Sequence, residues 1–144
     1  MNQIKLHTER LRISGLRPTK QRLVICKILF DRKETFHFTI DKLKQIVEKS
    51  NNKKISTATL YNTVHAFEKK GYLKEISLKG NKTFFDTNTK KHHHFYDEDL
   101  SKLIDIKNEN IFVKNLPQMP LGKKIKEIDV TIRIANNNQK QKNN

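Results

Sequence analysis

The chain contains almost no cysteine and no tryptophan. Its 144 residues include a single cysteine, Cys26, and no tryptophan. One cysteine excludes an internal disulfide, and it also excludes the paired Cys-x-x-Cys clusters that hold structural zinc. Because Cys26 falls inside an apolar helical run, we expect it to be a small buried hydrophobe.

Long hydrophobic runs are also missing. No stretch approaches the ~18 apolar residues that a membrane span needs, and residues 1–10 are polar and charged, without the apolar core of a secretory signal. We therefore expect a cytoplasmic protein with no membrane partner. Hydrophobic residues make up only 35% of the chain, and such a small supply of apolar surface favours burial between two subunits.

Positive charge is abundant. Lys and Arg number 30 against 15 Asp and Glu, which gives a formal net charge of +15. Residues 1–91 hold 21 basic and 8 acidic side chains, a net charge of +13, whereas residues 92–144 hold 9 and 7, a net charge of +2. An excess of this size indicates a polyanionic partner that binds the N-terminal half. Because lysine without a pattern can also serve only to solubilise a chain, sequence motifs must support this assignment.

Three segments have the apolar spacing of helices. In residues 19–30 we expect Leu23, Val24, Ile28 and Leu29 to face the core. The second segment begins after Thr39, a plausible N-cap. The third, residues 56–71, has Ser56 as its N-cap and Gly71 as its C-terminal cap. The second and third segments form a predicted helix-turn-helix.

The third segment has the composition of a recognition helix. Leu60, Val64 and Phe67 line one face, which must pack inward. The opposite face carries small, polar and aromatic side chains in place of the Glu and Lys of an ordinary solvated helix, and such side chains can meet base edges in a major groove. The residues predicted to contact bases are Thr57, Thr59, Tyr61 and Asn62.

A hairpin is predicted directly after this helix. Residues 72–78 and 82–86 are rich in branched and aromatic side chains and flank a Gly80-Asn81 turn. A hairpin in this position is a wing, so we predict a winged helix-turn-helix. The wing tip and the start of the first helical segment carry basic residues predicted to contact phosphate, although for the helix start ordinary solvated charge is the alternative. These residues are Arg17, Lys20, Arg22, Lys79 and Lys82.

The C-terminal part is predicted to form a small sheet. Residues 103–106 form a short strand, and alternation of Ile128, Val130, Ile132 and Ile134 with polar residues predicts another with one buried face. These strands are too few for an independent core, so we infer a homodimer that shares a sheet. The predicted fold is α+β, with a winged-helix DNA-binding domain over residues 1–86, an α/β dimerisation and sensing domain over 87–135 and a disordered tail over 136–144.

Three consecutive histidines follow the wing. In an extended segment His92 and His94 share a face and His93 lies on the other, so two imidazoles can bind one ion. The remaining ligands would come from His37, Asp86 and Asp105. A His/carboxylate set without thiolate suits Fe, Mn or Zn. Haem bound through His92, His93 and His94 is an alternative, and a loop that binds ions only incidentally is another.

Four motifs together resemble the ferric-uptake-regulator superfamily, most closely its iron-response-regulator (Irr-like) branch. They cover most of residues 15–106 in order: GLRPTKQR at 15–22, HFTIDKL at 37–43, STATLYNTVHAFEKKG at 56–71, and FDTNTKKHHHFYDED at 85–99 followed by LIDI. The resemblance implies a winged helix joined by a hinge to a dimerisation domain, with a sensory metal site at the hinge. The residues that fall on the positions of that site are His37, Asp86, His92, His94 and Asp105.

The chain departs from the superfamily at its other metal sites. Asp97, Glu98, Asp99 and Leu100 stand where one Cys-x-x-Cys pair is expected. Lys91 and Phe112 stand where ligands of a second accessory site are expected. These departures favour the Irr-like branch, whose resemblance implies haem sensing through the histidine triplet. The Cys-Pro haem motif of some members is absent, because Lys27 follows Cys26.

We therefore predict a dimeric regulator of iron and haem homeostasis that binds double-stranded operator DNA and responds to haem or Fe²⁺. One alternative is a peroxide-responsive or other divalent-metal-responsive regulator of the same superfamily. Another is a DNA-binding module without a ligand. A metal-dependent nuclease would need acid–base or two-metal geometry, and since the sequence holds no such motif we expect no enzymatic activity.

Overall fold

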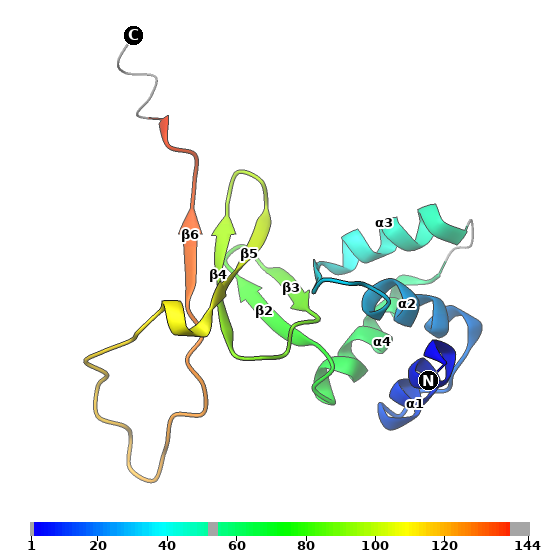
Figure 1. Ribbon diagram of the computed structural model, residues 1–144, viewed down its shortest axis with the longest axis horizontal. Helices are drawn as coiled ribbons and strands as arrows, with labels where there is room; N and C mark the ends of the chain where they lie inside the picture. Colours follow the sequence, from blue (N-terminus) through cyan, green and yellow to red (C-terminus); the bar gives the residue numbers. More distant parts are fainter. Residues whose placement is uncertain (1, 52–54, 139–144) are drawn as a thin grey trace. The chain divides into compact units, whose positions relative to one another are not determined.

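The chain folds into two compact units, Met1–Thr89 and Lys90–Asn144. The computed structural model describes residues 2–51 and 55–138, so residues 139–144 of the predicted disordered tail lie outside the described residues. Within the described residues the α-helices belong to unit 1, and each unit contains its own three-stranded sheet (Figure 1). None of the helices in the described ranges is both long and apolar enough to cross a membrane.

Unit 1 is a bundle of helices followed by a hairpin, as predicted for a winged helix. Its helices and strands, in chain order, are α1 (Gln3–Ile13), α2 (Lys20–Phe30), β1 (His37–Phe38), α3 (Ile40–Asn51), α4 (Thr57–Lys69), β2 (Lys74–Leu78) and β3 (Lys82–Asp86). The strands form an antiparallel sheet in the order β1-β3-β2. Helix α1 and strand β1, which contains His37, were not predicted.

Side chains predicted as caps begin two helices of unit 1, α3 and α4. Thr39 Oγ1 accepts a hydrogen bond from Lys42 N at 3.2 Å, and Ser56 Oγ accepts one from Thr59 N at 3.1 Å. At the other end of α4, Gly71 has φ 81°, a conformation that costs glycine little. Gly71 N and Tyr72 N then donate to carbonyl oxygens of the last turn. The caps fix the bounds of α4 close to the predicted ones.

An apolar core joins the helices of unit 1 to its sheet. Ile25, Cys26 and Leu29 of α2 are buried in it, whereas Leu23, Val24 and Ile28 are only partly buried. The four residues predicted to face the core therefore do pack on it. The prediction missed the buried Ile25 and also α1, which packs on α2 as well. The largest side chains of this core with almost no exposure are Phe38, Phe67, Phe85, Leu11, Ile25, Leu29, Leu43 and Leu60.

Unit 2 is a small mixed sheet with a long connection. Strands β4 (His92–Asp97) and β5 (Lys102–Lys107) are antiparallel, and β6 (Thr131–Ile134) pairs in parallel with β4. After the short 3₁₀ helix η1 (Asn108–Asn110), residues 111–130 run without helix or strand, as the long loop in Figure 1 shows. The last strand is shorter than predicted. Its expected buried face is open in the single chain, because Ile128 and Ile132 are 37% and 40% exposed.

Candidate nucleic-acid interface and metal centre

Helix α4 has one buried and one exposed face, as predicted for a recognition helix. Leu60, Val64 and Phe67 are fully buried. Thr63 is buried beside them, and its hydroxyl donates to Thr59 O at 2.7 Å, which removes the cost of burying it. On the other face Thr57, Tyr61, Asn62 and His65 are exposed. These exposed side chains can meet a base edge.

The four residues predicted to contact bases are not equivalent. Tyr61 is 45% exposed and Asn62 is also exposed. The Thr57 hydroxyl lies at the start of α4 and accepts a hydrogen bond from Lys44 Nζ at 3.1 Å. Thr59 is partly buried, and its hydroxyl lies 2.9 Å from Ser56 Oγ. Thr59 thus belongs to the capping structure of α4, whereas the other three offer accessible side chains.

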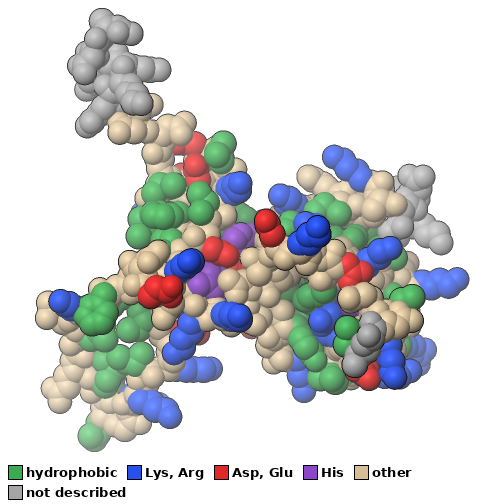
Figure 2. All heavy atoms as spheres, viewed as in Figure 1, with side chains coloured by type: hydrophobic (Ala, Val, Ile, Leu, Met, Phe, Trp, Pro, Cys, Tyr) green, Lys and Arg blue, Asp and Glu red, His purple; other side chains and the backbone are tan. Residues whose placement is uncertain are grey.

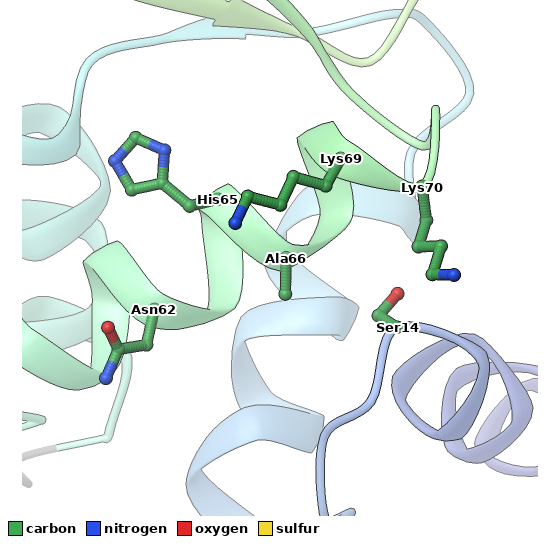
Figure 3. Close-up of a pocket in the computed structure, with 6 residues that line it drawn as sticks. All are labelled: Ser14, Asn62, His65, Ala66, Lys69 and Lys70. Carbon is green, nitrogen blue, oxygen red and sulfur yellow. The ribbon is translucent and has the colours of Figure 1, made fainter.

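A shallow pocket lies between α4 and the end of α1 (Figure 3). Its volume is about 300 Å³ and its lining contains no carboxylate. The lining residues are Ser14, Asn62, His65, Ala66, Lys69 and Lys70. Sequence reasoning missed the pocket, because Ser14 comes from the end of the unpredicted α1. Such a set of donors suits an anion.

The residues predicted to contact phosphate differ in exposure. Arg17 and Lys20 are exposed at the start of α2, and Lys79 and Lys82 are exposed at the tip of the wing. Arg22 is instead partly buried, and its Nη1 donates to Arg17 O at 3.0 Å, so it braces the turn before α2. Figure 2 shows many Lys and Arg side chains projecting from the helices of unit 1. Unit 1 therefore presents exposed basic side chains, and Lys69 and Lys70 add to them in the pocket that Asn62 and His65 of α4 also line.

Unit 1 carries two of the five predicted metal ligands, here called the unit 1 half-site. The antiparallel register of β1 and β3 places His37 directly opposite Asp86. His37 Nε2 donates to Asp86 Oδ2 at 3.1 Å, and Asp86 Oδ1 accepts from Asn88 N at 2.8 Å. Asp86 is completely buried. A carboxylate buried away from solvent is stable only when hydrogen-bond donors or a cation surround it. The burial of Asp86 beside His37 is therefore compatible with a role as a metal ligand.

Unit 2 carries the other three, here called the unit 2 half-site. His92 and His94 lie on the same face of β4, with ring centroids 4.4 Å apart. The Nε2 atom of each lies 3.3 Å from Asp105 Oδ1, because β5 places Asp105 opposite His94. All three histidines of the triplet are 4–6% exposed.

The hydrogen bonds of His92 fit a cation at this point. His92 Nδ1 donates to Lys90 O at 2.6 Å, so a neutral ring presents the lone pair of Nε2 to Asp105. A lone pair that faces a carboxylate is repulsive unless a cation or a proton lies between them. A bond from the second ring nitrogen to a backbone carbonyl is also the usual way in which proteins orient histidine ligands. The donor set of this half-site therefore suits a divalent ion.

His93 has a different task. It lies on the opposite face of β4, and its Nδ1 accepts a hydrogen bond from Val130 N at 3.0 Å. His93 thereby ties the segment before β6 to β4. The structure thus engages the three histidines in two separate ways, with His92 and His94 beside Asp105 and His93 beside Val130.

The sequence profile of the ferric uptake regulator family matches residues 13–133, which include both half-sites and α4. The chain belongs to the ferric uptake regulator family. Among curated proteins, the peroxide-responsive repressor PerR of Staphylococcus aureus (strain Mu50) is 34% identical to this chain over 95 residues. The match covers 66% of this chain and 62% of that repressor, so the chain matches less than two thirds of the relative's length.

Solved structures of the ferric uptake regulator family share the fold. The ferric uptake regulator of Vibrio cholerae has a TM-score of 0.67 at 18% identity, covering 89% of this chain and 98% of that one. The Pseudomonas aeruginosa ferric uptake regulator, solved with manganese, has a TM-score of 0.64 at 16% identity, covering 91% and 98%. These likenesses confirm the α+β architecture.

Within this family framework, the segment at the expected Cys-x-x-Cys position is the turn between β4 and β5. Asp97 Oδ1 accepts hydrogen bonds from Asp99 N and Leu100 N, both at 3.0 Å. A carboxylate that caps the turn holds the two strands together without a metal. The turn that a cysteine pair would occupy is closed here by hydrogen bonds.

Proposed function

We propose that this chain is a homodimeric transcription regulator that binds operator DNA and responds to a divalent metal ion. The observation that carries the proposal is that the His/carboxylate ligand set is divided between the two units. Unit 1 holds His37 and Asp86 together with α4, and unit 2 holds His92, His94 and Asp105. The proposal also rests on membership of the ferric uptake regulator family.

The DNA-binding part of the proposal rests on unit 1. Exposed Asn62 can bond an adenine edge through two hydrogen bonds, and Tyr61 and the Thr57 methyl can contact thymine methyls. Arg17, Lys20 and the wing lysines would add contacts to phosphate, which position the protein without reading sequence.

Division of the ligands gives a physical route to control. In this proposal, ligands from both units bind one ion, and their shared coordination of that ion restricts the angle between the units. In a dimer that angle sets the spacing of two recognition helices, and hence the fit to two half-sites on DNA. The ion supplies only charge and directed coordination. The residues of each unit supply the placement, through the β1–β3 pair in unit 1 and the β4–β5 pair in unit 2.

The proposed effector is a first-row divalent ion such as Fe²⁺, Mn²⁺ or Zn²⁺, because the donors are imidazole and carboxylate. A haem response through His92, His93 and His94 has less support, since His93 accepts from Val130 N and the other two meet at Asp105. A peroxide response is the alternative suggested by the Staphylococcus aureus relative, which is named a peroxide-responsive repressor.

The test begins by selecting bound duplexes from a random pool with the full chain in Mn²⁺. Affinity for the selected duplex is then measured by fluorescence anisotropy with Mn²⁺, with Zn²⁺, with haem and with chelator alone. We expect tighter binding with a divalent ion and no effect of haem. A further arm with Fe²⁺ under anaerobic conditions, measured with and without hydrogen peroxide, tests the peroxide response. Fe²⁺ is readily oxidised, and the same treatment of the Mn²⁺ arm provides the control.

Two variants separate the parts of the proposal. Asn62→Ala should reduce affinity for the selected duplex whether or not the ion is present. The double variant His92→Ala/His94→Ala should keep the affinity measured in chelator and lose the increase with Mn²⁺. Equal affinity for selected and scrambled duplexes would refute sequence-specific binding. Identical affinity in every effector arm would refute the sensing role.

A further inference from the structure

An aromatic stack lies on the exposed face of α4. The rings of Tyr61 and His65, one helical turn apart, are stacked with centroids 5.7 Å apart and planes at 17°. Tyr61 is 45% exposed on the face assigned to DNA. Stacking on His65 restricts the rotamers of Tyr61. Less conformational entropy is therefore lost when the ring of Tyr61 contacts DNA.

The stack continues from the surface into the core of unit 1. His65 meets the Phe85 ring edge-to-face, with centroids 5.9 Å apart and planes at 85°. Phe85 is 1% exposed and stacks on Phe38, with centroids 5.6 Å apart. Four rings therefore connect the outer face of α4 to the β1–β3 pair.

That strand pair also carries the unit 1 half-site. Phe38 pairs with Phe85, and the adjacent residues His37 and Asp86 pair with each other. Side chains alternate along a strand, so the two phenylalanines lie on one face of the pair and the two ligands lie on the other. A shift of either strand when His37 or Asp86 changes its bonding must move the phenylalanine on the same strand.

We propose that His65 is a positioning residue that holds Tyr61 in its DNA-facing orientation and couples that orientation to the His37–Asp86 half-site. This rests on the proposed function and adds to it a second route of control, inside unit 1 and independent of the angle between the units. Packed rings transmit such displacements because a close-packed core yields only by small concerted shifts. Tyr61 is then the residue whose contact with DNA changes with the metal.

The first test needs no DNA. Ring-labelled tyrosine is introduced into the full chain, and the Tyr61 NMR signals, assigned with Tyr61→Phe, are followed while diamagnetic Zn²⁺ is added. We expect the Tyr61 signals to move in the wild type. They should stay in place in His65→Leu, whose side chain favours the helix but has no ring. They should move again in His65→Phe, which restores a ring. His37→Ala should also abolish the shift.

The second test measures recognition. Thymine and uracil differ by one methyl group, so dT to dU replacement at each position of a selected duplex locates the methyl that Tyr61 contacts. With Mn²⁺ present, we expect His65→Leu to lower affinity by about threefold to tenfold at the dT duplex. It should lower affinity little at the dU duplex. His65→Phe should recover most of the loss.

The outcomes distinguish this proposal from the one on which it rests. Tyr61 signals that move equally in the wild type and His65→Leu would overturn the role of His65, even if metal-dependent DNA binding is confirmed. Equal dT-to-dU penalties in the two proteins would overturn it as well. Wild-type Tyr61 signals unchanged by Zn²⁺, although Zn²⁺ binds, would overturn the coupling. Failure of metal or DNA binding would be seen separately, in the wild-type titrations.

Discussion

At the scale of single residues, identical side chains have different tasks according to the face of the strand on which they lie. His92 and His94 meet at Asp105, whereas His93, between them in sequence, accepts a hydrogen bond from Val130 N. Sequence alternation predicted this division, but it could not identify Val130 as a partner, because the two residues are 37 positions apart. The partner depends on the parallel pairing of β6 with β4.

Substitution of the triplet one residue at a time tests this division. We expect His92→Ala and His94→Ala each to weaken Mn²⁺ binding by about tenfold or more, since each removes a ligand. His93→Ala should leave Mn²⁺ affinity nearly unchanged and lower the free energy of unfolding by about 1–3 kcal/mol, because Val130 N loses its acceptor. Isothermal titration and urea unfolding measure the two effects. A His93→Ala protein that loses Mn²⁺ affinity as strongly as His92→Ala would contradict the division.

Cys26 is predicted to be inert. Burial in the core of unit 1 raises the pKa of its thiol from 9.0 to about 12. Well below pH 9.0 the thiol is neutral in both the folded and unfolded states, so its contribution to stability is fully present. As the pH rises from 9.0 towards 12, the Cys26 thiol ionises only in the unfolded state, and the free energy of unfolding falls.

Two measurements check the prediction for Cys26. Iodoacetamide should alkylate the native protein far more slowly than the urea-unfolded protein, because the thiolate is the nucleophile and the native thiol is both buried and protonated. Cys26→Ala should reduce the loss of unfolding free energy between pH 9.0 and 12. Rapid native alkylation, or the same pH dependence in both proteins, would show that the thiol is accessible or titrates normally.

At the scale of elements, the sequence predicted α4 and the wing well, because their signals are local. Ser56, Gly71 and the Gly80-Asn81 turn each act within a few residues of where they stand. Helix α1 was missed because only His7 and Leu11 of its residues are buried, too few for a clear apolar stripe. Strand β1 has two residues and exists through its pairing with β3, which no local pattern specifies.

The pocket beside α4 depends on α1, and it leads to a prediction about the DNA backbone. If a phosphate lies against Lys69, Lys69→Gln should weaken binding about equally for different duplex sequences. It should also lower the slope of log affinity against log salt concentration by about 0.9. Lys27→Gln removes an exposed lysine of α2 that does not line the pocket and serves as the matched control. An unchanged slope for Lys69→Gln would exclude this phosphate contact.

At the scale of the whole molecule, the units differ in how completely they bury their apolar side chains. Unit 1 encloses a continuous core, whereas unit 2 leaves large hydrophobic side chains open, as Figure 2 shows around β6 and the long loop. Phe112 and Leu121 are 80% and 101% exposed. The sequence predicted a shared sheet from the shortage of strands. It could not predict which residues of 111–130 are exposed, because exposure depends on tertiary contacts that no local pattern specifies.

Exposed apolar surface of this extent is typical of an interface. We expect the wild-type chain to sediment at twice the 17.0 kDa of one chain. Ile132→Asp places a charge on the open face of β6 and should raise the dimer dissociation constant by about 30-fold or more, since burial of an unpaired charge is costly. Ile4→Asp is the control, because Ile4 is 63% exposed on α1 in unit 1. Sedimentation equilibrium over a range of concentrations gives both constants. Equal effects of the two substitutions would place the dimer contact elsewhere.

If only Ile132→Asp weakens the dimer, this variant should also bind a duplex with two half-sites less tightly than the wild type does. Its affinity for a duplex with a single half-site should stay unchanged, because only the two-site duplex needs two linked recognition helices.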